Sequence, residues 1–191
     1  MKKILAIVGM AGAGKSEVAD FFIRKGFDYI RLGQLTLDEV KRKKLPPGEE
    51  SERKIRENIR KIHGMAAFAI LNFPKIDKLR GDVVVDGLYS WEEYLVFKKK
   101  YKNFYCIAVY ANPQIRYQRL VGRSGRHGID ENLKYRSFKK TETPKRDQAE
   151  IENLNKGGPI AMADFTIINE GTKKELEANL KKIWQKIKTN G

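Results

Sequence analysis

The sequence lacks the features that stabilise secreted or membrane-embedded proteins. It has one cysteine, Cys106, in 191 residues, so no internal disulfide can form. No apolar stretch approaches the roughly 20 residues that a membrane-spanning helix requires. Internal repeats, low-complexity tracts and a dividing linker are also absent. We therefore expect one cytoplasmic α/β domain over residues 1–191, with no membrane partner.

Acidic residues are scarce relative to basic ones. Lys and Arg number 39 against 24 Asp and Glu, which gives a formal net charge of +15. Such an excess favours polyanionic partners, which include nucleic acids, nucleotides and acidic surfaces. Abundant Lys, Arg and Glu are also typical of hyperthermophilic proteins, so habitat is an alternative source of part of the charge. The only tightly basic run, residues 98–102, accompanies no known nucleic-acid-binding motif.

Short runs rich in Val, Ile, Phe and Tyr predict β-strands. These runs are residues 4–8, 29–32, 83–85, 104–110 and 165–168. Several are apolar throughout, which is typical of strands buried on both faces of a parallel sheet. Helical patterns separate them, at residues 16–25, 50–71, 90–100, 113–121 and 173–187. The alternation predicts an α/β fold with right-handed crossovers.

Two segments interrupt the alternation of strands and helices. Residues 34–72 contain a polar stretch with Pro46-Pro47-Gly48 and continue into a long predicted helix that bends near Gly64. Residues 119–158 carry many charges and no strand pattern. We expect both segments to be inserts within one domain.

The clearest motif runs from Gly9 to Ser16 and fits G-x-x-x-x-G-K-[ST]. Its small residues let successive backbone N–H groups curl around a β-phosphate, and the helix that begins near Gly14 adds its N-terminal dipole. Lys15 is placed to reach the β- and γ-phosphates, and Ser16 to hold Mg²⁺. The motif lies between a strand and a helix, which favours a P-loop over a chance match in a glycine-rich turn. The predicted ATP-binding residues here are Gly9, Ala11, Gly12, Ala13, Gly14, Lys15, Ser16 and Glu17.

Asp86 ends the apolar run Val83-Val84-Val85. A carboxylate at the carboxyl end of a strand beside a P-loop is where Mg²⁺ and its waters are held. Apolar strands also end in Asp where it forms a turn or a cap, but the P-loop favours the metal role. The sequence therefore predicts ATP and Mg²⁺ as cofactors, with Ser16 and Asp86 as metal ligands.

Further motifs resemble those of nucleoside monophosphate kinases. Asp86-Gly87 resembles their D-G, residues 119–123 resemble the R-x-x-G-R that opens their lid, and residues 146–150 resemble the R-D stretch that closes it. Residues 163–171 resemble the A-D-x-x-I-x-N-x-G of dephospho-CoA kinases. Over nearly its whole length the chain resembles an archaeal group of adenylate-kinase-related, dephospho-CoA-kinase-like P-loop proteins.

This resemblance implies a three-layer P-loop NTPase fold with a parallel five-stranded sheet. It further implies a helical lid over about 119–158 and an acceptor-binding insert over about 34–72. Arg119 and Arg123 would bind the ATP phosphates, and Asn169 to Gly171 would lie against the adenine. Arg146 would stabilise the transferring phosphoryl group, since positioned cations do most of the work in phosphoryl transfer. The implied catalytic residues are Lys15, Asp86, Arg123 and Arg146.

The acceptor side departs from the family pattern. Those kinases usually carry an arginine soon after D-G, whereas no basic residue follows Asp86-Gly87 before Lys98. Arginines at positions 31, 53, 56 and 60 are candidate replacements, although the last three also fit a solvated helix face. Tyr89 and Trp91 are candidates for stacking on an acceptor base. The residues predicted to bind the acceptor are Arg31, Arg56, Arg60 and Tyr89.

The leading hypothesis is a small-molecule kinase that moves the γ-phosphate of ATP onto a nucleotide-like acceptor. A nucleoside monophosphate and dephospho-CoA both fit as that acceptor. The competing hypothesis, motivated by the charge of +15, is a nucleic-acid-binding or regulatory P-loop ATPase. Against it, the basic residues are spread along the chain, and no aromatic residues alternate with them as single-strand binders prefer.

Overall fold

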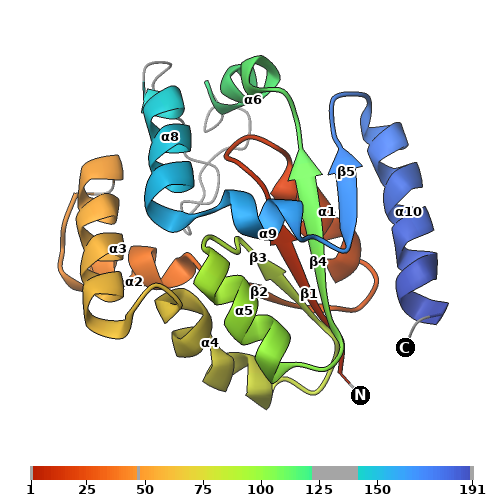
Figure 1. The fold of residues 1–191 in the computed structure, drawn as a ribbon, viewed down its shortest axis with the longest axis horizontal. Helices are drawn as coiled ribbons and strands as arrows, with labels where there is room; N and C mark the ends of the chain where they lie inside the picture. Colours follow the sequence, from red (N-terminus) through yellow and green to blue (C-terminus); the bar gives the residue numbers. More distant parts are fainter. Residues whose placement is uncertain (1, 47, 122–141, 190–191) are drawn as a thin grey trace.

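The computed structural model describes residues 2–46, 48–121 and 142–189. A five-stranded sheet forms its centre, with the strand order β2-β3-β1-β4-β5 and every pairing parallel. The strands are β1 (Ile4–Val8), β2 (Asp28–Arg31), β3 (Val83–Asp86), β4 (Phe104–Tyr110) and β5 (Phe165–Ile168). Helices cover both faces of the sheet (Figure 1), so the predicted three-layer α/β fold is confirmed.

Two hydrophobic cores lie between the sheet and its helices. On one face the sheet packs against α1 (Lys15–Ile23) and α10 (Lys173–Thr189), and on the other against α4 (Ala67–Lys78), α5 (Trp91–Lys100) and α9 (Gly157–Ala161). Successive strand residues point to opposite faces. Leu5 and Ile7 therefore enter the first core, while Ile4 and Ala6 enter the second. This two-sided burial explains why the first strand is apolar throughout.

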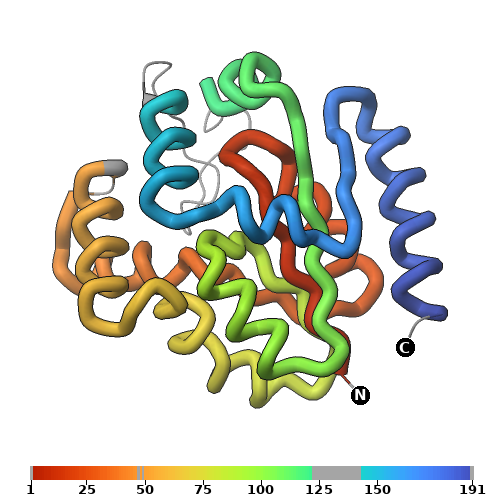
Figure 2. The backbone as a smooth tube through the Cα atoms, viewed as in Figure 1, coloured from red at the N-terminus to blue at the C-terminus, as the bar shows by residue number. Residues whose placement is uncertain are grey.

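The remaining described helices lie outside these layers. They are α2 (Gln34–Arg42), α3 (Glu49–His63), α6 (Pro113–Leu120) and α8 (Glu142–Leu154). Helices α3 and α8 are far apart in the sequence but lie side by side (Figure 2), and both line one cavity.

The helix predicted over residues 50–71 is divided in the structure. Helix α3 ends at His63, and Gly64 follows with a φ of 79°, a left-handed conformation that favours glycine. Helix α4 then begins at Ala67. Helices α2, α8 and α9 were not predicted as elements. Residues 122–141 of the predicted lid lie outside the described residues.

Candidate functional site

The loop from Gly9 to Ser16 joins β1 to α1 at the carboxyl edge of the sheet. Gly12 has a φ of 80°, and a Cβ added there would lie 2.5 Å from the carbonyl oxygen of Arg116. A Cβ added at Gly9 would collide with the carbonyl oxygen of Val109. The loop is thus held directly against β4 and α6, and a larger residue at either glycine would force the backbone to move.

Lys15 is the first residue of α1 and points back into the loop. Its ammonium group donates hydrogen bonds to the carbonyl oxygens of Gly9 at 2.9 Å and Met10 at 3.1 Å. Burial and the nearby Lys156 lower the pKa of Lys15 to about 7, although Asp86 acts in the opposite direction. A phosphate group beside Lys15 would restore the charged form, because a nearby anion favours an ammonium ion.

Asp86 is the last residue of β3, and the strand register places it between Ile7 of β1 and Arg31 of β2. Its carboxylate is buried and accepts a 3.0 Å hydrogen bond from the hydroxyl group of Tyr29. Burial and this carboxylate raise the pKa of Tyr29 well above its usual range. The Asp86 carboxylate also lies near enough to Lys15 to act on its pKa. A negative charge therefore lies beside the loop.

The donor set around Asp86 fits Mg²⁺ bound together with a nucleotide. Ser16, the other predicted ligand, is the half-buried second residue of α1. The described parts of the chain contain no cluster of three or more His, Cys, Asp or Glu residues that could hold a metal ion. Mg²⁺ needs no such cluster, since it is usually held by one or two carboxylates, waters and substrate phosphates.

Of the other residues predicted to bind ATP, one contacts the loop directly. Asn169, just after β5, donates a 2.8 Å hydrogen bond to the carbonyl oxygen of Ala13 in the loop. Gly171 is exposed, two residues further along. Glu17 points outward and pairs with exposed Lys173 at 3.3 Å. Arg119 is half-buried in the last turn of α6, and Arg123 lies outside the described residues.

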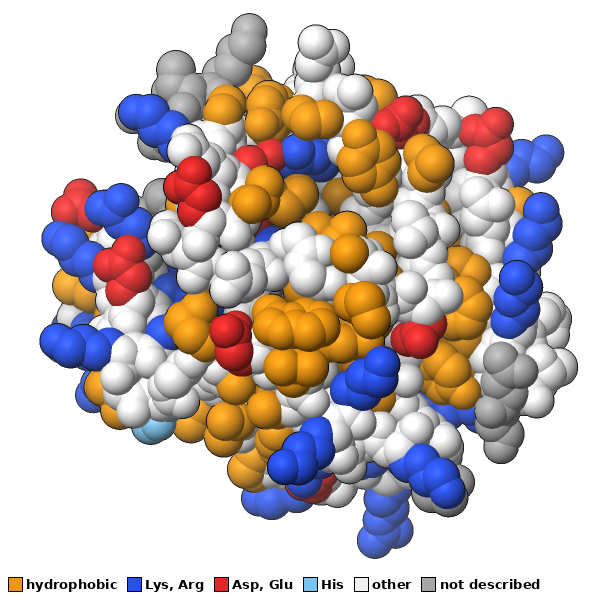
Figure 3. Space-filling model, viewed as in Figure 1, with side chains coloured by type: hydrophobic (Ala, Val, Ile, Leu, Met, Phe, Trp, Pro, Cys, Tyr) orange, Lys and Arg blue, Asp and Glu red, His pale blue; other side chains and the backbone are white. Residues whose placement is uncertain are grey.

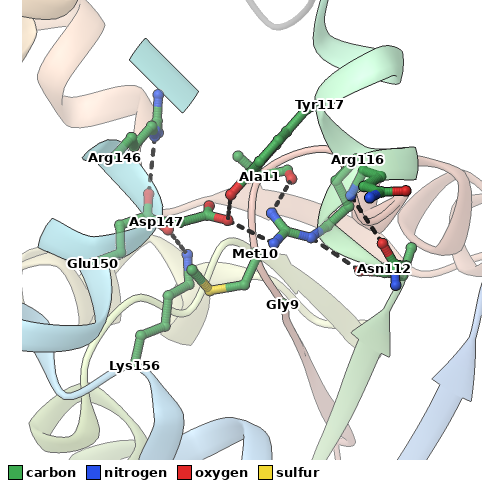
Figure 4. A network of polar contacts seen from close by, with 12 residues as sticks. Gly9, Met10, Ala11, Asn112, Arg116, Tyr117, Arg146, Asp147, Glu150 and Lys156 are labelled. Atoms are coloured by element: carbon green, nitrogen blue, oxygen red, sulfur yellow. Dashed lines mark hydrogen bonds and ion pairs between the residues drawn. The ribbon is translucent and has the colours of Figure 1, made fainter. Parts of the chain in front are cut away.

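Arg116, which the sequence patterns did not single out, connects the P-loop to α8 (Figure 4). Its guanidinium group donates to the carbonyl oxygen of Ala11 at 3.0 Å and to the carboxylate of Asp147 at 2.6 Å. The hydroxyl group of Tyr117 donates to the same carboxylate oxygen at 3.1 Å. Arg116 and Asp147 are both buried, so this ion pair is shielded from water.

Glu150 lies one helical turn after Arg146 and joins two cations. It accepts hydrogen bonds from Arg146 at 3.0 Å and from Lys156 at 2.5 Å. Burial acts to raise the pKa of Glu150, but Lys156, Arg146 and Lys15 together hold it well below its usual range. Lys156 is 1% exposed, and its ammonium nitrogen lies 5.0 Å from the ring centre of Tyr89. Nothing in the charged sequence around Lys156 distinguished it from a solvated lysine.

A cavity of about 210 Å³ lies between α3, α8 and the segment that follows β3. All four residues predicted to bind the acceptor line it, namely Arg31, Arg56, Arg60 and Tyr89. Two further arginines and three carboxylates contribute to the lining, namely Arg53, Arg146, Glu52, Glu57 and Glu150. Trp91 does not line the cavity, because its ring stacks on that of Tyr94 with centroids 5.2 Å apart.

Arg60 is the most deeply placed of the α3 arginines. Its side chain is 9% exposed, compared with 20% for Arg56 and 62% for Arg53. The guanidinium carbon lies 4.7 Å from the ring centre of Phe68. Within the part of the chain that the structure describes, its Nε and Nη2 atoms have no hydrogen-bond partner. The Nη2 atom lies 3.9 Å from the buried carboxylate of Glu93, the acidic partner of Arg60. Arg60 therefore brings to the cavity wall a guanidinium group whose hydrogen-bonding capacity is only partly used.

The strand order, the glycine-held loop around Lys15 and the helices beyond the carboxyl edge define a P-loop kinase-like protein. The chain belongs to the UPF0200 family, and residues 5–156 match the AAA domain family. It is 33% identical to the UPF0200 protein TK1334 of Thermococcus kodakarensis, over 96% of this chain and 97% of that protein. It is 34% identical to the UPF0200 protein of Sulfurisphaera tokodaii, over 97% of each chain.

Solved structures share the fold at low sequence identity. TT1252 from Thermus thermophilus gives a TM-score of 0.62 at 18% identity, with 97% of each chain covered. Shikimate kinase from Bacteroides thetaiotaomicron gives 0.58 at 13% identity, over 97% of this chain and 98% of that one. Dephospho-CoA kinase from Campylobacter jejuni gives 0.52 at 15% identity, with 97% of each chain covered. These likenesses show the P-loop kinase-like fold.

Proposed function

We propose that this protein is an ATP- and Mg²⁺-dependent phosphotransferase that acts on a small nucleotide-like acceptor, such as a nucleoside monophosphate or dephospho-CoA. One observation carries the proposal: a single buried cluster connects the P-loop to the arginine-lined cavity. Arg146 and Glu150 line the cavity, and Arg116 joins Asp147, the neighbour of Arg146, to the carbonyl oxygen of Ala11 in the P-loop. An acceptor in the cavity would therefore lie next to a nucleotide on the loop.

On the nucleotide side, the loop from Gly9 to Ser16 would hold the phosphates, with Lys15 charged by their presence. Ser16 and Asp86 would hold Mg²⁺, which neutralises charge on the β- and γ-phosphates. Arg119 and Arg123 would bind the ATP phosphates, and Arg146 would stabilise the transferring phosphoryl group. Asn169 and Gly171 would lie against the adenine. Closure of a lid over about 119–158 would exclude water that otherwise hydrolyses ATP.

On the acceptor side, the insert over about 34–72 supplies two of the four proposed binding residues, Arg56 and Arg60. Arg56 and Arg60 of α3, with Arg31 at the end of β2, would bind an anionic group of the acceptor. Arg60 pairs with Glu93 at a distance of 3.9 Å, and its Nε atom has no hydrogen-bond partner among the described residues, so its guanidinium group retains capacity to bind an anion. Tyr89 presents an aromatic ring on which a base can stack.

The names of the structural neighbours agree with this class of reaction but differ in acceptor. The related folds include proteins titled shikimate kinase, gluconokinase and dephospho-CoA kinase. The acceptor must therefore be inferred from the cavity of this chain. Five arginines against three glutamates in its lining favour a phosphate-bearing acceptor over a neutral one.

An acceptor panel tests the proposal. The protein is incubated with γ-labelled ATP, Mg²⁺ and AMP, CMP, UMP, dephospho-CoA, RNA with 5′-hydroxyl ends, or no acceptor. We expect label in one small acceptor and little hydrolysis without it. Arg60→Met should then raise KM for that acceptor and leave KM for ATP nearly unchanged, whereas Arg42→Met, at an exposed residue of α2, should change neither. ATP hydrolysis with no labelled small acceptor would contradict the proposal.

The second candidate, a nucleic-acid-binding P-loop ATPase, is favoured by the net charge of +15. On the face in Figure 3, hydrophobic side chains occupy much of the middle, and most Lys and Arg side chains lie toward the edge. A polynucleotide track needs a continuous basic surface, which this face does not present. The arginine-lined cavity supports the phosphotransferase, and salt dependence separates the two functions.

A further inference from the structure

We infer that Lys156 is a second phosphate-binding lysine: its ammonium group contacts the transferring phosphoryl group together with Lys15 and Arg146. In the structure, the carboxylate of Glu150 pairs with Lys156 and Arg146 where we place that phosphoryl group. This inference rests on the proposed phosphotransferase function. The comparisons assign no role to Lys156, and the sequence motifs do not include it.

The first argument is the position of Lys156 between the nucleotide side and the acceptor side of the site. Lys156 immediately precedes α9, and its side chain is 2% exposed. Its ammonium group shares the carboxylate of Glu150 with Arg146, the arginine proposed to stabilise the transferring phosphoryl group. The same group lies 5.0 Å from the ring centre of Tyr89, which lines the acceptor cavity. Lys156 thus lies where a group passing from nucleotide to acceptor would be found.

The charge balance of the cluster is the second argument. Lys15, Arg146 and Lys156 act on the carboxylate of Glu150, and the last two pair with it at 3.0 and 2.5 Å. Two further carboxyl groups belong to the cluster: Asp86 acts on Lys15, and Lys156 acts on Glu93, whose pKa burial raises to about 7. Arg60 acts on both Glu93 and Glu150, so these groups comprise four basic side chains and three carboxyl groups. Buried cations in excess are costly unless further anions join them. A phosphoryl group in transfer brings several partly charged oxygens and would complete the cluster.

The way Glu150 is held is the third argument. One of its oxygens accepts from Arg146 and the other from Lys156, so the carboxylate bridges two cations. Figure 4 shows the two side chains reaching Glu150 from opposite sides. A phosphoryl group offers three oxygens in place of two and accepts the same charge-assisted hydrogen bonds. Displacement of Glu150 from Lys156 would therefore exchange one anion for another at the same cations.

The transfer step itself requires no proton from Lys156. The acceptor oxygen, which loses its proton to solvent if it belongs to a hydroxyl group, donates an electron pair to the γ-phosphorus. The bond from that phosphorus to the β–γ bridging oxygen breaks, and its electron pair leaves with ADP. Lys156 exchanges no proton in this step and stabilises charge on the oxygens of the transferring phosphoryl group.

A purely structural role for Lys156, in which it only neutralises Glu150, makes a different prediction. If that were its role, the double variant would behave like Glu150→Gln alone, because Arg146 loses its carboxylate partner equally in both proteins. If Lys156 contacts phosphate, the double variant would be the more defective of the two. A comparison of Lys156→Met, Glu150→Gln and the double variant therefore separates the two roles. Lys98→Met is the matched control, since Lys98 also lies over a tyrosine ring, 5.4 Å from that of Tyr94, but is exposed.

Two quantities are measured: the single-turnover rate of transfer to the acceptor that the panel identifies, and the ratio of ATP to ADP affinity. The ratio reports contacts to the γ-phosphate and needs no acceptor. We expect Lys156→Met and the double variant to lower the rate by about 10²-fold and to lower the ratio. Glu150→Gln should raise the ratio, because the competing carboxylate charge is gone, and a fall would contradict the role of Glu150. Lys98→Met should leave both quantities unchanged.

Equal rates and equal ratios in the double variant and in Glu150→Gln would overturn the inference. If Lys156→Met fails to fold, the double variant still decides, because it leaves no carboxylate deprived of its lysine. If the wild-type protein labels no acceptor, the proposed function fails. The affinity ratio then still tests Lys156, and a ratio in the folded double variant equal to that of Glu150→Gln refutes its contact with the γ-phosphate.

Discussion

The guanidinium group of Arg116 lies 2.6 Å from the carboxylate of Asp147, with the two side chains 5% and 10% exposed. The same guanidinium group also contacts the carbonyl oxygen of Ala11 in the P-loop. Asp147 is next in the chain to Arg146, which lines the cavity. One buried ion pair therefore sets the position of α8, and with it Arg146, relative to the P-loop.

Removal of Arg116 should destabilise the protein strongly. Arg116→Met would leave the Asp147 carboxylate buried without its cation, so we expect the free energy of unfolding in urea to fall by about 3 kcal/mol or more. The double variant Arg116→Met/Asp147→Asn should recover part of that loss. As a control, Arg42→Met removes an exposed pair with Glu39 and should leave the unfolding midpoint nearly unchanged. Equal unfolding midpoints for Arg116→Met and Arg42→Met would show that the buried pair stabilises the protein no more than the exposed pair does.

Nucleotide affinity should depend on pH through Lys15. The pKa of Lys15 is about 7 in the empty protein, and a bound phosphate raises it, so binding above pH 7 takes up a proton. Affinity should fall by up to about tenfold per pH unit between pH 7 and 9. Calorimetry in buffers of different ionisation enthalpy measures the proton uptake.

Lys15→Met is the matched variant for that measurement. It should keep its fold by circular dichroism, lose ATP turnover, and lose the pH dependence above pH 7. The charges around Lys15 that act on its pKa are Lys156, Asp86, Glu150 and Arg146, and all remain in the variant. Normal turnover in Lys15→Met would refute the proposed function, and an unchanged pH profile would assign the dependence to another group.

Asp86→Asn should lose Mg²⁺-dependent turnover with little effect on nucleotide binding in the absence of Mg²⁺. The substitution removes a charge beside the loop and preserves the size of the side chain. Tyr29→Phe serves as the control, because it removes only the hydrogen bond that Asp86 accepts. Binding and turnover are measured as a function of Mg²⁺ concentration. Full Mg²⁺-dependent turnover in Asp86→Asn would show that this carboxylate is structural.

Arg146 and Arg123 should act on the transition state more than on binding. Substitution of either by Met should lower kcat by about 10²-fold or more, with a smaller change in ATP affinity. Lys145→Met, at the exposed neighbour of Arg146 in α8, should leave kcat unchanged. Steady-state kinetics with independent measurement of ATP binding separates the two effects. A loss of affinity at normal kcat would reassign these arginines to ground-state binding.

Salt dependence should distinguish a small acceptor from a polynucleotide. An increase from about 50 to 200 mM salt should weaken acceptor binding only modestly, because few phosphates are engaged at once. Binding to a nucleic-acid track with six or more phosphates would fall by ~10³ or more over the same range through counterion release. A steep salt slope, nanomolar RNA or DNA affinity at physiological salt, and ATP hydrolysis stimulated by that nucleic acid would favour the second candidate.

The strands were predictable because their burial is encoded locally. Residues 4–8 and 104–110 have the bounds that the apolar runs predict, since strands inside a two-sided sheet need apolar side chains at every position. Helix α8 was not predicted, because hydrophobic periodicity identifies a helix only where its buried face is apolar. The buried face of α8 carries Thr143, Asp147 and Glu150.

The role of the arginines of α3 could not be determined from their spacing. The same spacing fits a solvated helix face and an anion-binding face. In the structure the exposed fraction falls from 62% at Arg53 to 9% at Arg60, so one row of arginines runs from solvent into the cavity. That gradient depends on how α3 packs against Phe68, which no local pattern expresses.

By itself, the sequence determined the parallel sheet and the loop around Lys15. Apolar runs of strand length and the spacing of glycines are local features, so they can be identified before the fold is known. Only the tertiary structure decided which charges are buried together. Lys15 and Lys156 are distant in the chain, and Arg116 is paired with Asp147 across 31 positions. The energy of a buried charge depends on the charges that surround it in space. The sequence alone therefore does not distinguish Lys156 from a solvated lysine, and only the fold shows that it is buried and paired with Glu150.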